Sequence, residues 1–267
     1  MAKQAKIGHK NPFGKYWMAL TASPKGCYNR AKGAIMTVLL TGATGGIGQE
    51  TARLFAHEGY NLALGYHANE AGAKALADEL TRDYGVWAVP IRLDLEDKAQ
   101  LSAAIEWVQA TMGRISILVN NAAISLVKPI EETTSEEWDK VIAVDLTGAF
   151  WACKCVLPSM REGGAIVNVS SMWGSLGASC EVAYAAAKGG LEAMTKSLAK
   201  EYPDVRIGAV SLGWVDTPMN ARFDEADKQA FFAQNPTMHV LSPRDAAEAI
   251  LRAIRGEESG QVFRLGW

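Results

Sequence analysis

The sequence has few cysteines, few histidines, no long apolar run and little net charge, and each absence excludes a class of protein. No stretch approaches about 18 uninterrupted apolar residues, so no transmembrane helix is expected. The net charge of -2 gives no electrostatic basis for binding nucleic acid. No metal site can be assembled from His9, His57 and His239. With 49% hydrophobic and 21% charged residues, the 267-residue chain has the balance of a globular protein.

The four cysteines, Cys27, Cys153, Cys155 and Cys180, lack the paired spacing of a zinc site. Cys153 and Cys155 lie within an apolar stretch of helical pattern, which predicts buried free thiols. No apolar core of a secretory signal is present near the start. We therefore expect a protein of the reducing cytoplasm.

Acidic residues are absent from the first 35 residues, which carry seven lysines and arginines. Because the whole chain carries -2 and this segment carries +7, residues 36–267 carry -9. Residues 1–35 show no sustained periodicity and are interpreted as a flexible basic extension. Three origins remain open for it: an organelle-targeting peptide, a functional tail, or an upstream translational extension of a domain that starts at Met36.

From Met36 onward, short β-rich runs alternate with longer stretches of helical periodicity. Strands are expected at Met36–Leu40, Asn61–Tyr66, Trp87–Arg92, Ile117–Asn120, Ala165–Ser170, Val205–Ser211 and Gln261–Leu265. Helices are expected at Ile47–Glu58, Glu70–Tyr84, Glu96–Met112, Ser135–Met160, Val182–Glu201 and Pro243–Arg255. Alternating strands and helices indicate βαβ units, so we predict one Rossmann-like α/β domain over residues 36–267. Its doubly wound parallel sheet should carry helices on both faces.

Glycines are concentrated directly after the first expected strand, in Thr41–Gly48. Glycines allow a sharp turn and a close approach of the backbone to a pyrophosphate, which the N-terminus of the next helix attracts. The spacing of Gly42, Gly46 and Gly48 is Gly-x-x-x-Gly-x-Gly, which differs from the common dinucleotide spacing. The position of this cluster at the first strand-to-helix junction predicts a nucleotide-binding site.

The end of the second expected strand lacks a carboxylate. An acidic residue there accepts the ribose 2′-hydroxyl of NAD, whereas a basic residue accommodates the 2′-phosphate of NADP. His67 follows this strand; protonated, it can pair with a phosphate, but it also fits an ordinary surface position. Gly45 provides no cation in the glycine turn, so the prediction of NADP over NAD depends on the missing carboxylate and His67. Asp94 either accepts a hydrogen bond from the adenine amino group or caps the next helix.

A serine, a tyrosine and a lysine follow the fifth expected strand at informative spacings. Tyr184 comes 13 residues after Ser171, and Lys188 comes four residues after Tyr184, on the same helix face. A nearby ammonium lowers the pKa of a phenol, so Lys188 is expected to lower that of Tyr184. Tyr184 then exchanges a proton with a carbonyl or alcohol oxygen, which Ser171 holds by a hydrogen bond.

Together these motifs resemble the short-chain dehydrogenase/reductase family over the whole length from Met36. The resemblance also covers Asn120–Ala123 after the fourth strand and Gly213–Met219 after the sixth. It implies hydride transfer between NAD(P)H and a carbonyl, with Tyr184 as the proton donor, Ser171 orienting the substrate and Lys188 binding the ribose. The implied cofactor-binding residues are Gly42, Thr44, Gly45, Gly46, Ile47, Gly48, His67, Asp94, Leu95, Asn121, Ala122, Tyr184, Lys188, Gly213, Val215 and Thr217.

Three positions depart from the pattern of the family. Asp145 stands where a catalytic asparagine is usual, and an ionised carboxylate there would hold Lys188 charged and alter the proton relay. We therefore count Asp145 among the expected catalytic residues. Leu212 replaces the usual proline before Gly213, and the chain ends at Trp267 without the usual final double glycine.

Within the family, the chain is most similar to 3-oxoacyl-acyl-carrier-protein reductases, which implies a 3-oxoacyl thioester substrate of fatty-acid synthesis. Trp173-Gly174 and Gly177–Val182 also resemble a branch that includes elongation factor P 5-aminopentanone reductases. A third alternative, suggested by the departures, is a weakened nucleotide-binding sensor or scaffold. The resemblance implies a homotetramer or homodimer. The segment Thr217–Val240 is expected to be a lid over the substrate or a helical pair packed on the core.

Overall fold

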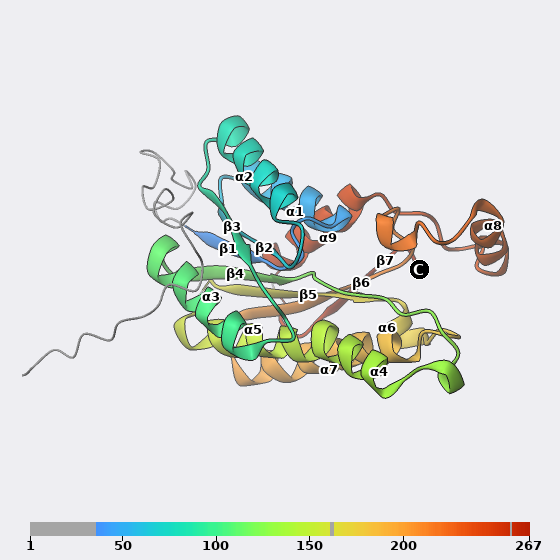
Figure 1. Ribbon diagram of the computed structural model, residues 1–267. Helices are drawn as coiled ribbons and strands as arrows, with labels where there is room; N and C mark the ends of the chain where they lie inside the picture. The colour runs from blue at the N-terminus through green and yellow to red at the C-terminus, as the bar shows by residue number, and fades with distance from the viewer. Residues whose placement is uncertain (1–35, 161–162, 257) are drawn as a thin grey trace, which may run out of the picture.

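The computed structural model describes residues 36–160, 163–256 and 258–267, so the expected basic extension lies outside the described residues. Its strands form one parallel sheet in the order β3-β2-β1-β4-β5-β6-β7 (Figure 1). The strands are β1 (Thr37–Leu40), β2 (Asn61–Tyr66), β3 (Ala88–Arg92), β4 (Ile115–Asn120), β5 (Ala165–Ser171), β6 (Arg206–Leu212) and β7 (Val262–Leu265). The order reverses between β1 and β4, and ligands of such sheets bind beyond the carboxyl ends of the strands at this reversal.

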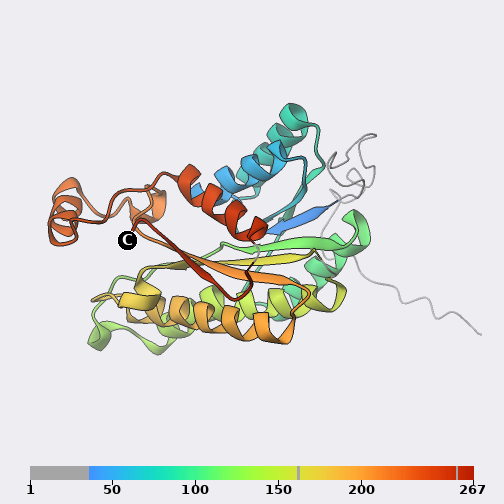
Figure 2. The same cartoon turned by 180° about the vertical axis from the view of Figure 1, so that it is seen from behind.

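Helices cover both faces of the sheet, as Figures 1 and 2 show from opposite sides. One face carries α1 (Gly46–His57), α2 (Glu70–Tyr84) and α9 (Pro243–Arg255). The other carries α3 (Lys98–Met112), α4 (Ser135–Ile142), α5 (Gly148–Val156) and α7 (Val182–Glu201). The shorter elements are η2 (Ile130–Glu132), η3 (Ala143–Thr147), η4 (Leu157–Ser159), α6 (Trp173–Leu176), η5 (Pro218–Asn220) and α8 (Glu225–Gln234). The predicted doubly wound fold is confirmed.

Alternating side chains of the strands fill two hydrophobic layers. In β1, Val38 and Leu40 belong to the layer under α1, α2 and α9, whereas Leu39 belongs to the layer under α3 and α5. All three are fully buried. Burying a side chain of this size contributes about 1.5–3 kcal/mol. The strands are apolar on both faces because both faces are covered.

Side-chain caps fix where several helices begin. Ser242 caps α9 and exchanges hydrogen bonds with Asp245 in a capping box, and Pro243 occupies the first turn. Thr134 forms the same box with Glu137 at the start of α4. The cap at Ser242 explains why the expected start of α9 agrees with the structure. The expected bounds of α2, which Asn69 caps, and of α7, which has no side-chain cap, also agree.

The expected helix over Ser135–Met160 is wrong as a single α-helix. The chain widens into a π-helical turn at η3, which separates α4 from α5, and ends in the 3-10 turn η4. Among the described residues, Ser135–Ser159 is long and apolar enough to cross a membrane by length and composition alone. In this fold α5 packs against α3, and α4 packs against α7.

Candidate active site

The glycine turn joins β1 to α1 and leaves room for a ligand at the helix N-terminus. Gly42 has a φ of +65°, and a Cβ there would lie 2.8 Å from the Cα of Ala122. A Cβ on Gly48 would overlap the carbonyl oxygen of Gly42 and approach the Cα of Ala43 to 2.9 Å. Gly45 precedes α1 without a side-chain cap. Free N–H groups and a glycine surface at this point fit the pyrophosphate of a dinucleotide.

Replacing Gly48 by alanine is expected to weaken NADPH binding at least about 10-fold, because the added methyl group forces the turn open. The matched control is Gly208→Ala on β6, a position that lines neither cavity and where a Cβ meets neighbouring atoms only at 3.7 Å. Dissociation constants from nucleotide fluorescence would check both variants. Equal affinities of the two variants would mean that the tight turn is not needed for binding.

The turn is hydrogen-bonded to the segment that follows β4. The Thr41 hydroxyl accepts the backbone N–H groups of Asn121 and Ala122, each at 3.0 Å. The Asn121 side chain donates to the carbonyl oxygens of Thr41 and Gly42 at 3.0 and 3.1 Å. These bonds hold the ends of β1 and β4 in register at the sheet reversal. Sequence reasoning did not single out the role of Thr41.

A cavity of about 580 Å³ lies beside the glycine turn. It is lined by most of the expected cofactor-binding residues: Gly42, Thr44, Gly45, Gly46, Ile47, Gly48, His67, Asp94, Leu95, Asn121, Ala122 and Thr217. Its size and glycine-lined floor fit a dinucleotide.

His67 and Arg92 lie close to Asp94 at the edge of this cavity. The Nε2 atom of His67 lies 3.7 Å from Asp94 Oδ2, and Arg92 Nη2 lies 3.5 Å from the same oxygen. The interpretation of Asp94 as the cap of the next helix is wrong, because Asp97 accepts the first N–H groups of α3. Asp94 instead accepts the backbone N–H of Glu96 at 3.2 Å.

A second cavity, of about 510 Å³, contains Ser171, Tyr184 and Lys188. Ser171 ends β5, and the other two lie one helical turn apart on α7. The Lys188 Nζ atom lies 5.3 Å from the centre of the Tyr184 ring, and a hydrogen bond joins Ser171 to the Tyr184 phenol. Gly213 and Val215 line this cavity rather than the first one. The structure therefore brings together the three residues that the spacing had grouped.

The two cavities adjoin, since Asn121, Ile47 and Thr217 line both. A dinucleotide bound along the glycine turn would extend from there towards the cavity that contains Tyr184. This adjacency fits a group that supplies a hydride to a substrate in the second cavity.

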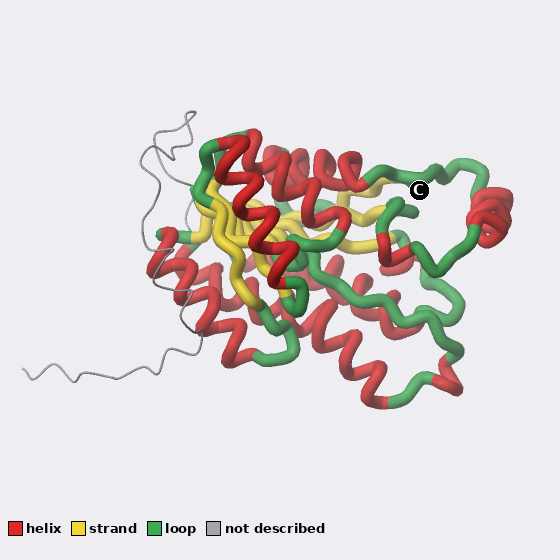
Figure 3. The backbone as a smooth tube through the Cα atoms, turned by 45° about the horizontal axis from the view of Figure 1, so that its top comes forward, coloured by secondary structure: helices red, strands yellow, loops and turns green. Residues whose placement is uncertain are grey.

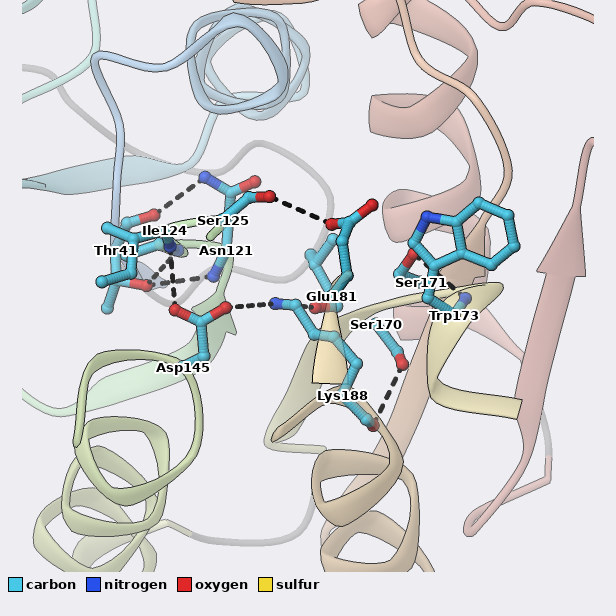
Figure 4. A network of polar contacts seen from close by, with 12 residues as sticks. Thr41, Asn121, Ile124, Ser125, Asp145, Ser170, Ser171, Trp173, Glu181 and Lys188 are labelled. Carbon is cyan, nitrogen blue, oxygen red and sulfur yellow. Dashed lines mark hydrogen bonds and ion pairs between the residues drawn. The ribbon is translucent and has the colours of Figure 1, made fainter. Parts of the chain in front are cut away.

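Asp145 lies behind the second cavity and pairs with Lys188 (Figure 4). Its Oδ1 atom accepts the backbone N–H of Ile124 at 2.8 Å, and its Oδ2 atom lies 3.6 Å from Lys188 Nζ. Lys188 also donates to the carbonyl oxygen of Val169 at 3.1 Å. Both charged side chains are almost fully buried. The π-helical turn at η3 places this carboxylate.

Burial and Asp145 together set the protonation of the site. Burial raises the pKa of the Tyr184 phenol, the Asp145 carboxylate raises it further, and the hydrogen bond with Ser171 lowers it. Burial lowers the pKa of Lys188, which Asp145 counteracts. The expected lowering of the Tyr184 pKa by Lys188 is therefore wrong here, because Asp145 offsets the ammonium charge and the phenol is buried.

Two carboxylates near the site were missed as functional candidates. Glu192, on α7, accepts the hydroxyls of Ser170 at 2.9 Å and Ser175 at 3.1 Å, which fixes the segment after β5. Glu181, directly before α7, lines the second cavity and accepts the Ser125 hydroxyl at 3.1 Å. The position of Glu181 three residues before Tyr184 was the available signal in the sequence.

An aromatic cluster connects the second cavity to α8, which stands at the end of the molecule beyond the strand tips (Figure 3). The Trp173 ring lies 5.9 Å from that of Phe231, and the Trp214 ring lies 5.2–6.0 Å from those of Phe223, Phe231 and Phe232. No residue of α8 is fully buried. The segment Thr217–Val240 thus meets the cavity through edge and tilted contacts between aromatic rings, and its helix α8 is not packed into the core.

Known proteins share this architecture. A solved structure titled as a gluconate 5-dehydrogenase from Burkholderia cenocepacia, in complex with NADP and tartrate, superposes with a TM-score of 0.80 at 28% identity. The similarity covers 86% of this chain and 93% of that one.

Curated relatives of similar sequence are oxidoreductases as well. The chain is 36% identical over 232 residues to the 3-oxoacyl-acyl-carrier-protein reductase FabG of Thermotoga maritima, covering 84% of this chain and 94% of the relative. It is 32% identical over 240 residues to YmfI of Bacillus subtilis, named an uncharacterized oxidoreductase, covering 86% and 98%. Residues 36–228 match the family model described as short chain dehydrogenase. The chain therefore belongs to the short chain dehydrogenase family of NAD(P)-dependent oxidoreductases.

Proposed function

We propose that this protein reduces a ketone to a secondary alcohol with NADPH. The observation that carries the proposal is the placement of Ser171, Tyr184 and Lys188 in a cavity that adjoins the glycine turn. When bound, the nicotinamide supplies the hydride. The glycine turn and the N-terminus of α1 hold the pyrophosphate, and the residues of the second cavity hold the ketone.

The chain's own side chains supply the proton and orient the ketone oxygen. Because its pKa is raised, Tyr184 stays protonated at neutral pH and can donate its proton to that oxygen. Ser171 hydrogen-bonds the same oxygen and stabilises the charge that develops on it. Lys188, held by Asp145 and the Val169 carbonyl, provides a fixed ammonium behind the phenol.

A 3-oxoacyl thioester is the substrate class we propose first, because the Thermotoga maritima relative is named for that activity. The test is the loss of NADPH absorbance with acetoacetyl-CoA, beside a panel of simple and cyclic ketones. Turnover of at least one ketone, abolished in a Tyr184 variant, supports the proposal. NADPH binding without turnover of any ketone would leave a nucleotide-binding protein and refute it.

The position of His67 at the edge of the first cavity allows a prediction about the relative affinities for NADPH and NADH. His67→Asp places a second carboxylate beside Asp94, so the affinity for NADPH should fall about 10-fold relative to NADH. The matched control is His57→Asp, an exposed position at the far end of α1. Titration of each variant with both nucleotides checks this. An unchanged ratio of the two affinities in His67→Asp would remove His67 from recognition of the 2′-phosphate.

We propose a homo-oligomer. Large apolar side chains on the outer faces of three helices support it: Trp138 on α4, Phe150 on α5 and Val182 on α7 are each about two-fifths exposed. Light scattering at several protein concentrations measures the oligomeric state. A monomer at every concentration would refute the proposed homo-oligomer.

A further inference from the structure

Glu192 is a buried carboxylate that the proposed proton transfer does not use. It lies on α7 one helical turn after Lys188, is 7% exposed and is not part of the lining of either cavity. None of the ion pairs within residues 36–160, 163–256 and 258–267 includes it. A carboxylate withdrawn from water without a cation must receive hydrogen bonds, because burying it unpaired is costly. The donors of these bonds therefore indicate the role of Glu192.

Two hydroxyls from different segments of the chain share the Glu192 carboxylate. Ser170, near the end of β5, donates to Oε1 at 2.9 Å, and Ser175 of α6 donates to Oε2 at 3.1 Å. Each carboxylate oxygen thus accepts one hydroxyl. An amide has a single acceptor oxygen, and an apolar side chain has none. The carboxylate therefore ties both the end of β5 and the α6 segment to α7.

The α6 segment buries none of its four residues, so it is held by backbone contact and hydrogen bonds. It meets α7 where two glycines touch: a Cβ on Gly189 would lie 2.9 Å from the carbonyl oxygen of Gly174. Ser175 follows Gly174 directly, and its hydroxyl reaches Glu192 from this point. The hydrogen bond thus fixes α6 on α7 at the place where the two backbones meet.

The segment held by Glu192 carries two residues of the substrate cavity. Ser171 and Trp173 both line that cavity, and the Trp173 N–H donates to the Ser171 hydroxyl at 3.3 Å. Figure 4 shows both residues, with Ser170, on the stretch of chain beside Lys188. A displacement of α6 would therefore move the hydroxyl that orients the ketone and the ring that forms one wall of the cavity.

The same face of α7 makes polar contacts with β5 on either side of Glu192. Lys188 donates to the carbonyl oxygen of Val169 at 3.1 Å, and the Thr195 hydroxyl accepts the side-chain amide of Asn168 at 2.8 Å. Buried polar groups favour the one arrangement in which all of them are paired. These contacts thus fix the register of α7 on β5, and with it the position of the proton donor relative to the end of the strand.

We propose that Glu192 is a positioning residue of the reaction: by holding Ser170 and Ser175, it sets where Ser171 and Trp173 stand beside a bound ketone. The inference rests on the proposed ketone reduction and applies to any ketone that the cavity accepts, a 3-oxoacyl thioester included. Glu192 touches neither ketone nor nucleotide, so its loss should slow turnover without weakening the binding of NADPH.

Glu192→Met tests this role, because methionine fills a similar volume and provides no acceptor for the two hydroxyls. The kcat/KM for acetoacetyl-CoA, or for the best ketone of the panel, should fall about 10- to 100-fold, mainly through kcat. The dissociation constant of NADPH should stay close to that of the wild type. Glu192→Gln should restore most of the turnover, because it keeps one acceptor while Ser170 can donate to the Lys188 carbonyl oxygen, 3.2 Å away. The matched control is Glu201→Met at the exposed end of α7, which should turn over ketone at the wild-type rate.

Hydrogen exchange of backbone amides, measured without any ketone, separates this inference from the proposed function. The amides of residues 175–177 donate to the carbonyl oxygens of Met172 and Trp173. In Glu192→Met they should exchange about 10-fold faster, whereas the amides of α9 should keep their wild-type rates. If they do so but the wild type reduces no ketone, Glu192 still positions α6 and the proposed function falls. Unchanged exchange of these amides, or a wild-type kcat/KM in Glu192→Met, would overturn the inference.

Discussion

Replacing Tyr184 by phenylalanine is expected to lower ketone turnover about 10²- to 10⁴-fold, which is the usual contribution of a positioned proton donor. The substitution removes one oxygen atom and keeps the ring that packs beside Lys188 and Ala183. Affinity for NADPH should therefore remain close to that of the wild type. Single-turnover rates and nucleotide titration measure the two quantities separately.

Ser171→Ala is the companion variant for this experiment. Its hydroxyl contacts the Tyr184 phenol and accepts the backbone N–H of Trp173 at 3.3 Å, so its loss should slow turnover by less than the loss of the proton donor. Thermal melting of both variants checks that the fold is retained. If Tyr184→Phe turned over ketone at the wild-type rate, Tyr184 would have no part in the proton transfer.

The fold could be predicted from the sequence because the sequence signals of its strands, helices and turns are local and repeated. The apolar strand runs, the capping residues Ser242 and Thr134, and the glycines after β1 each act within a few positions of the element that they define. Tyr184 and Lys188 were grouped correctly because one helical turn separates them. Ser171 was grouped with them because parallel strands end on one edge of the sheet.

Features that depend on the burial of a side chain, or on contacts between residues distant in the sequence, could not be predicted in the same way. The π-helical turn at η3 inserts one extra residue into a helix whose periodicity continues on both sides, so Ser135–Met160 was expected to be continuous. The raised pKa of Tyr184 depends on burial and on Asp145, 39 positions earlier in the chain. The position of Glu181 in the lining of the second cavity likewise follows only from the three-dimensional structure.

Asp145→Asn is expected to shift the pH dependence of catalysis towards lower pH. The carboxylate raises the pKa of Tyr184, so its replacement by a neutral amide of the same size should lower that pKa. The amide oxygen can still accept the N–H of Ile124, which keeps the η3 turn in place. The measurement is kcat against pH in both directions of the reaction.

In Asp145→Asn the pH profile is expected to move to lower pH for both alcohol oxidation and ketone reduction. Alcohol oxidation needs the ionised phenol, so activity rises as the pH passes the pKa of Tyr184, and a lower pKa moves this rise to lower pH. Ketone reduction needs the protonated phenol, so activity falls above the same pKa, and this fall also moves to lower pH. A shift in opposite directions would mean that another group titrates.

Two further variants separate the effect of charge from that of structure. Asp139→Asn makes the same substitution at an exposed position of α4 and should leave the pH profile unchanged. Asp145→Ala removes the acceptor of the Ile124 N–H as well as the partner of the buried Lys188, so it should lower the free energy of unfolding by about 3–5 kcal/mol. Asp145→Asn should lose less, because only the charge is gone. An unaltered pH profile in Asp145→Asn would show that this carboxylate does not affect the pKa of Tyr184. The raised pKa of the phenol could then not be explained by Asp145 offsetting the charge of Lys188.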